Sequence, residues 1–131
     1  MISESFINLP GASKHFIDGR ILYSKEIQTK FLEKPFSKES SVSKTMAMDL
    51  AKTMQKISGA DWVLAETGML GPPSMDKRSD KNGQCYFALA LKNEIKHKYL
   101  EFNPFLTKKE HKLLIGIEAF TWIKNVLQNK Y

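Results

Sequence analysis

The residues best placed for chemistry form a short run, Thr67-Gly68-x-x-Gly71-Pro72, one residue after the apolar stretch from Trp62 to Ala65. Open α/β sheets place their ligands at the carboxyl ends of strands. Glycines there permit a positive φ and a close backbone approach. Their amides, together with the Thr67 hydroxyl, could hold an anionic group such as a phosphate. Because Gly and Pro are equally typical of ordinary turns, an ordinary turn stays open as the alternative.

The other reactive residue types give weaker signals. Three histidines, His15, His97 and His111, have no Cys, Asp or Glu at ligand spacing, so neither a metal site nor a cofactor is expected. The single Cys85 cannot form an intramolecular disulfide, which favours a reducing, cytoplasmic setting. The pair Lys108-Lys109 opens a predicted helix, where it could reach a phosphate or simply be solvated.

Composition narrows the class of protein. The chain has 131 residues, 42% hydrophobic and 26% charged, which fits one globular domain over residues 1–131. No apolar run approaches the ~20 residues of a membrane span, and the first ten residues lack the features of a signal peptide. The net charge is +6, but 18 of the 20 basic residues are lysines spread along the chain. Nucleic-acid readout favours arginine and clustered charge, so no nucleic-acid or membrane partner is expected.

Periodicity predicts the elements that must position the loop. In chain order they are a helix over 1–8, a strand over 20–24, a helix over 25–31, a helix from Ser43 to Gly59, a strand over 62–65, strands over 84–91 and 98–102, and a helix from Thr107 onward. Residues 66–68 are expected as a polar turn. This order predicts an α/β protein with helices packed on both faces of a mixed sheet.

Within the two long helices, spacing also predicts the buried faces and the ends. Core-facing residues are expected at Met46, Leu50, Met54 and Ile57, and at Leu113, Ile117, Phe120, Ile123 and Leu127. Ser43 is expected as an N-cap and Gly59 as the residue that ends its helix. Thr107 and Glu110 have the spacing of a capping box.

Several of these pieces together resemble one family. They are Leu9-Pro10-Gly11-Ala12-Ser13, Phe16, Gly19, Tyr23-Ser24, Val42-Ser43, Ala47, Ala51, Gly59-Ala60-Asp61, Thr67-Gly68-x-x-Gly71-Pro72 and Gly83. Their order and spacing resemble the CinA C-terminal domain family, whose bacterial members include nicotinamide mononucleotide deamidases. The resemblance covers nearly the whole chain. The forms of residues 65–68 and 10–13 look nearest to its plant and fungal CinA-like branch.

The resemblance implies a three-layer α/β/α fold with a mixed sheet. It also implies an amidohydrolase reaction that converts nicotinamide mononucleotide to nicotinate mononucleotide and ammonia, with a serine nucleophile activated by a lysine. On this resemblance Thr67, Gly68, Gly71 and Pro72 correspond to the ligand loop. Tyr23 and Ser24 correspond to a pair of pocket residues. The implied ligand is a pyridine nucleotide such as nicotinamide mononucleotide.

The chain departs from the family pattern at both catalytic positions. Met1 aligns just after the family's Glu-Ser-x-Thr-Gly-Gly motif, so that motif and the strand and helix before it are absent. Ser3 and Ser5 fit no nucleophile position. Gln28 stands where the family lysine is expected, and Lys25 and Lys30 flank it at other helical offsets. No catalytic residue is therefore assigned, and whether the chain is an enzyme stays open.

Three interpretations follow from this pattern. The chain is a CinA-like domain with a retained nucleotide pocket and a degenerate dyad, or an active deamidase whose serine is encoded upstream of Met1, or a non-enzymatic interaction module. The missing strand should lie between the strands at 20–24 and 62–65. These two must then pair directly, or a partner chain must supply the edge, and homo-oligomers are expected.

Overall fold

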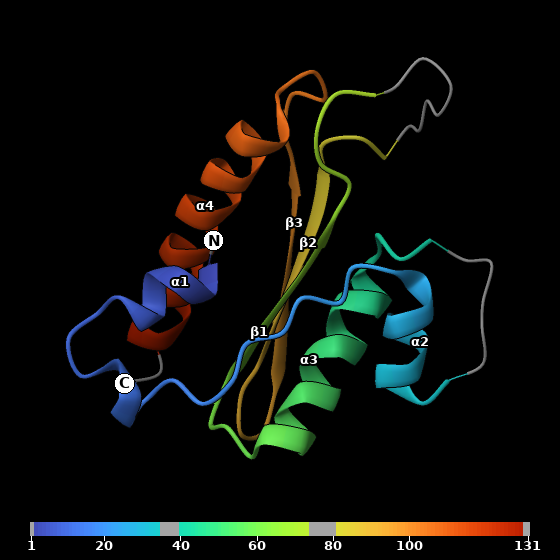
Figure 1. Cartoon of the computed structure of the whole chain (residues 1–131). Helices are drawn as coiled ribbons and strands as arrows, with labels where there is room; N and C mark the ends of the chain where they lie inside the picture. The colour runs from blue at the N-terminus through green and yellow to red at the C-terminus, as the bar shows by residue number, and fades with distance from the viewer. Residues whose placement is uncertain (1, 35–39, 74–80, 130–131) are drawn as a thin grey trace. The chain divides into compact units, whose positions relative to one another are not determined.

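The computed structural model describes residues 2–34, 40–73 and 81–129 (Figure 1). Its elements are α1 (Ile2–Ile7), η1 (Ala12–Lys14), α2 (Lys25–Leu32), α3 (Lys44–Ser58), β1 (Val63–Gly68), β2 (Gln84–Ala90), β3 (Ile95–Glu101) and α4 (Lys108–Gln128). The strands form an antiparallel sheet in the order β1-β2-β3. The predicted α/β class is confirmed.

The chain divides into two compact units. Unit 1 comprises Met1–Phe16, Met69–Cys85 and Leu100–Tyr131, and unit 2 comprises Ile17–Gly68 and Tyr86–Tyr99. Each unit is described by itself below. No helix in the described ranges is both long enough and apolar enough to cross a membrane.

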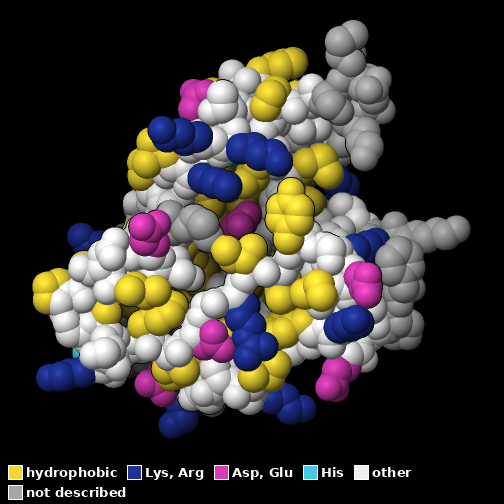
Figure 2. Space-filling model, in the orientation of Figure 1, with side chains coloured by type: hydrophobic (Ala, Val, Ile, Leu, Met, Phe, Trp, Pro, Cys, Tyr) yellow, Lys and Arg dark blue, Asp and Glu magenta, His cyan; other side chains and the backbone are white. Residues whose placement is uncertain are grey.

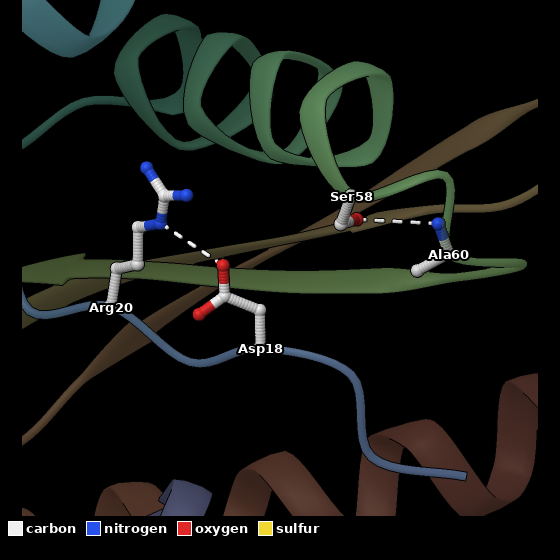
Figure 3. Close-up of polar contacts among 4 residues, drawn as sticks. All are labelled: Asp18, Arg20, Ser58 and Ala60. Atoms are coloured by element: carbon white, nitrogen blue, oxygen red, sulfur yellow. Dashed lines mark hydrogen bonds and ion pairs between the residues drawn. The ribbon is translucent and has the colours of Figure 1, made fainter.

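Unit 2 is built around α3, whose two ends confirm the sequence prediction. The Ser43 hydroxyl accepts the Met46 N–H at 3.1 Å, which satisfies one of the amides that a helix N-terminus leaves without a partner. Gly59 ends the helix with φ +70°, a left-handed conformation that glycine adopts without strain. The Ser58 hydroxyl accepts the Ala60 N–H at 3.2 Å, which fixes the turn toward β1 (Figure 3).

Alanines form the contact between α3 and the sheet. Ala47 and Ala51 are fully buried and pack with Val63, Ala88 and Ala90. Small side chains let the helix lie close to the strands, so the longer side chains of α3 lie at the edge of this contact. Met48 and Met54 pack against the cluster from there. Of the predicted stripe, Met54 is confirmed, because it packs against the cluster. The fully buried positions are instead one residue after Met46 and Leu50, and Ile57 is 53% exposed.

Residues 20–24 form no strand, and the prediction of a strand there was wrong. Across 17–23 no backbone hydrogen bond joins this segment to another described residue. Arg20 instead donates to Asp18 at 3.1 Å (Figure 3) and lies 5.6 Å from the centre of the Phe31 ring. Ser24 caps α2. The expected direct pairing with the strand that follows Trp62 does not occur, because β1 pairs only with β2 in the described sheet.

Two strands, β1 and β3, are longer than the sequence indicated. β1 continues through Glu66, Thr67 and Gly68, so the polar turn expected at these residues was wrong. β2 confirms the strand predicted from Gln84. Its residues 87–90 are all buried, which shows that both faces of this strand are covered.

Unit 1 is organised by α4, which begins at the predicted capping box. The Thr107 hydroxyl accepts the Glu110 N–H at 3.1 Å, and the Glu110 carboxylate accepts the Thr107 N–H at 3.2 Å. Phe6 of α1 packs against Phe120 of α4, with ring centres 4.8 Å apart. Phe6 also stacks with Phe16 at 6.4 Å.

The buried face of α4 differs from the prediction. Its buried residues are His111, Ile115, Ala119, Ile123 and Val126. Ile123 was predicted correctly, but Leu113 is 66% exposed and Ile117 is 55% exposed. The helix carries apolar residues on two faces with the same spacing, so periodicity alone selects either one.

Candidate ligand loop and its histidine anchor

The first part of the predicted loop lies at the end of β1 in unit 2. The Thr67 hydroxyl donates to the Ser41 carbonyl at 2.6 Å, so the segment before α3 is joined to the end of the strand. Gly68 is the last residue of β1. With its proton committed to Ser41, Thr67 has only oxygen lone pairs to offer a ligand.

The predicted pocket pair, Tyr23 and Ser24, lies at the start of α2. Ser24 is the N-cap of this helix, and its hydroxyl accepts the Ile27 N–H at 3.2 Å. The Tyr23 side chain is 84% exposed. Within the described part of unit 2, no hydrogen bond or ring contact joins either residue to Thr67.

The second part of the loop lies in unit 1 and is held by backbone contacts. Gly71 is buried with φ +88°, and its N–H donates to Nδ1 of His111 at 2.8 Å. Its carbonyl accepts a hydrogen bond from Nδ2 of Asn82 at 3.2 Å. A Cβ at this position would lie 2.8 Å from Cγ of Lys108. Glycine is therefore required both by the backbone conformation and by the lysine stem. Pro72 is exposed.

His111 is the residue that organises this loop. It is fully buried, and its Nε2 lies 2.8 Å from the Asn103 carbonyl. A carbonyl only accepts, so Nε2 carries the proton and Nδ1 is free to accept from Gly71. The Phe102 ring lies 6.1 Å from the imidazole ring. His111 thus joins three chain segments through one neutral ring.

Sequence reasoning considered His111 only as a metal ligand and missed this role. The available signal was its spacing, because positions 111, 115, 119 and 123 recur at four-residue intervals along α4. Among the described residues, no group of three His, Cys, Asp or Glu side chains is arranged to hold a metal ion.

The first turn of α4 also carries a carboxyl group whose pKa is shifted. The Thr107 backbone N–H, and after it the Thr107 hydroxyl, hold the pKa of Glu110 below its usual value of 4.5. The ionised carboxylate is the form that accepts the capping hydrogen bond, and it also lies favourably near the positive end of the helix.

Gln28 is the residue at which the sequence prediction expects the family lysine. The Gln28 amide Nε2 donates to the Leu22 carbonyl at 2.9 Å, which ties α2 to the segment before it. Lys30 pairs with Glu26 at 3.3 Å, with both side chains more than 70% exposed. An amide cannot take a proton from a hydroxyl, so Gln28 cannot act as a general base.

Comparison with known proteins gives the family of the chain. The sequence pattern of the CinA C-terminal domain matches residues 1–127. The chain belongs to the CinA C-terminal domain family. A CinA-like protein of Geotalea uraniireducens is 28% identical over 130 residues, which are 97% of this chain and 30% of that relative. A CinA-like protein of Syntrophotalea carbinolica is 29% identical over 135 residues, and 32% of its length is covered. The chain thus spans about a third of these relatives.

Solved structures of the CinA superfamily share the fold. The competence/damage inducible protein CihA from Agrobacterium tumefaciens matches with a TM-score of 0.80 at 20% identity, over 95% of this chain and 76% of that chain. A CinA superfamily protein from Klebsiella pneumoniae matches with a TM-score of 0.85 at 17% identity, over 98% and 80% of the two chains. At these identities the likeness concerns the fold alone.

Proposed function

We propose that this CinA-like domain, related to nicotinamide-nucleotide amidohydrolases, binds a pyridine nucleotide such as nicotinamide mononucleotide and does not hydrolyse it. The observation that carries the proposal is Gln28. It stands where the family resemblance implies a lysine base, and its amide is bonded to the Leu22 carbonyl. Without a base near its hydroxyl, a serine is a poor nucleophile at neutral pH.

Three hydroxyls in the described part of unit 2 support the same conclusion. Ser24 and Ser43 accept helix N–H groups as N-caps, and Thr67 donates to the Ser41 carbonyl. Each of these three hydroxyls is hydrogen-bonded to a backbone group. An acyl transfer would require one of them to lose its proton to a neighbouring base.

The loop contacts also define how a nucleotide would be held. The Gly71 amide is already taken by His111, so it is not free for a phosphate. The Thr67 hydroxyl donates its proton to the Ser41 carbonyl, so it can accept from a ribose hydroxyl or the carboxamide N–H of the nucleotide but cannot donate to the phosphate. Nucleotide binding is expected to be weaker than in a loop that offers free amides.

The test is a pair of measurements on the purified chain. Calorimetric titration with nicotinamide mononucleotide should show binding, and Thr67→Val should weaken it, since valine keeps the shape and removes the hydroxyl. Ser58→Ala is the matched control, because it removes a hydroxyl that accepts a backbone N–H elsewhere in unit 2 and is assigned to no ligand contact. Ammonia release should stay at the uncatalysed level. Turnover of roughly one per second or more would contradict the proposal that the nucleotide is not hydrolysed. Absence of a heat of binding would contradict the proposal that nicotinamide mononucleotide is bound.

A further inference from the structure

α4 exposes an apolar face that its own unit does not cover. Leu113 and Ile117 are one helical turn apart and more than half exposed, while Phe120 continues the same face and packs against Phe6. These residues form the floor of an open groove of about 920 Å³ in unit 1. From Lys109 to Phe120 the groove follows about 17 Å of the helix at 1.5 Å per residue, which is three turns.

Three lysines, Lys108, Lys109 and Lys112, form the rim of this groove. None of them makes an ion pair or hydrogen bond with any part of the chain that the structure describes. In the described chain the nearby Glu110 forms no ion pair with these lysines, and its carboxylate accepts the Thr107 N–H. Figure 2 shows basic side chains gathered over the upper end of α4 beside hydrophobic ones.

Gly116 lies within the floor, in the interior of the helix. Its backbone is not in the left-handed region, and a Cβ there would meet no atom within 4 Å. Neither the local conformation nor packing within the chain requires glycine, which costs helix stability relative to alanine. A glycine at such a place lets another backbone approach the helix closely.

We propose that this groove binds an acidic amphipathic helix of another protein. Apolar residues spaced by about four positions, flanked by charge, are the anchors of the helix-in-groove mode of recognition. The unpaired lysine rim selects carboxylates on the partner. A second copy of this chain would bring the same groove residues, which include no Asp or Glu to meet the three lysines. A nucleic acid would find an apolar floor without arginine, and the Phe120 ring is already packed on Phe6.

The experiment uses two synthetic 15-residue helical peptides and the full chain. Both peptides carry leucines at four positions of one face. One has glutamates beside the leucines, and the other has lysines. Binding is measured by fluorescence anisotropy, and the contacted residues are mapped by amide NMR shifts. The glutamate peptide should bind at least tenfold more tightly than the lysine peptide, with shifts confined to residues 108–121.

Two substitutions in the chain sharpen the test. Lys109→Glu should reverse the peptide preference, whereas Lys124→Glu, on the same helix outside the groove, should leave it unchanged. Gly116→Ala should raise the Tm and at the same time weaken the glutamate peptide several-fold. If Gly116 had only a structural role, Gly116→Ala would raise the Tm without weakening the binding of the glutamate peptide.

Several results would overturn the proposal. They are equal binding of the two peptides, shifts elsewhere in the chain, no binding of either peptide, or tighter binding of a single-stranded oligonucleotide or of anionic phosphatidylserine vesicles at residues 108–121. A concentration-dependent dimer that protects these residues would instead assign the groove to a second copy. These outcomes do not depend on Thr67 or on nicotinamide mononucleotide, so they are separable from the proposed function.

Discussion

The hydrogen bond from Gly71 to His111 gives the sharpest stability prediction. The histidine is fully buried, and the bond joins a buried amide to Nδ1 at 2.8 Å. Replacing His111 by leucine leaves this amide without a partner, which costs about 1–3 kcal/mol. The Asn103 carbonyl on the other side belongs to an exposed residue, so water can replace that bond at little cost.

Three variants separate the two bonds. In His111→Asn the side-chain oxygen lies near the position of Nδ1 and can still accept from Gly71. In His111→Gln the amide nitrogen lies nearer to Nε2 and keeps the bond to Asn103 instead. We therefore expect His111→Asn to be more stable than His111→Gln and His111→Leu by about 1–3 kcal/mol.

Urea unfolding measures this difference. With a slope of about 1–3 kcal/mol per molar urea, the midpoint of His111→Leu should lie about 1 M below that of His111→Asn. Wild-type ¹⁵N shifts should also report a neutral ring protonated at Nε2. If His111→Gln is as stable as His111→Asn, the buried amide is not what His111 satisfies, and the reasoning is refuted.

Two further predictions concern the same end of unit 1. Because the pKa of Glu110 is lowered in the folded chain, its stabilising effect should be present above about pH 4.5 and lost as the pH falls below it. The Tm difference between wild type and Glu110→Gln should therefore disappear in acid, and a difference that grows in acid would contradict the assignment. Gly71→Ala should lower stability by about 1–2 kcal/mol, since alanine at φ +88° is strained and its Cβ would meet Lys108. Gly59→Ala, with a similar φ and open space, isolates the contribution of the lysine contact in the same urea assay.

Structural features that depend on contacts between residues close in the sequence could be predicted from the sequence. The capping box at Thr107 and Glu110 and the ends of α3 depend on contacts over three or four positions, and the structure confirms them. The strand at 20–24 could not be decided in this way, because a strand needs a partner that the sequence alone does not provide. Likewise, two apolar faces of α4 share one period, and only packing chooses between them.

The candidate site was predictable only in part. The sequence singled out Gly71 for a ligand, whereas the structure shows its amide bound to a histidine 40 positions later in the chain. No local pattern records a contact of that range. Ligand contacts of Thr67, Gly68, Pro72, Tyr23 and Ser24 stay predictions, as do the pyridine nucleotide and the homo-oligomer.

The extended segment 17–23 affects how readily copies of the chain associate at high protein concentration. Ile17, Ile21 and Tyr23 are all more than 60% exposed, and their backbone has no ladder partner in the described chain. Such a segment is a template for cross-β association between copies. Asp18 and Arg20 interrupt its apolar residues with charge, in the manner of gatekeepers. Neutralising this pair would remove a barrier to aggregation.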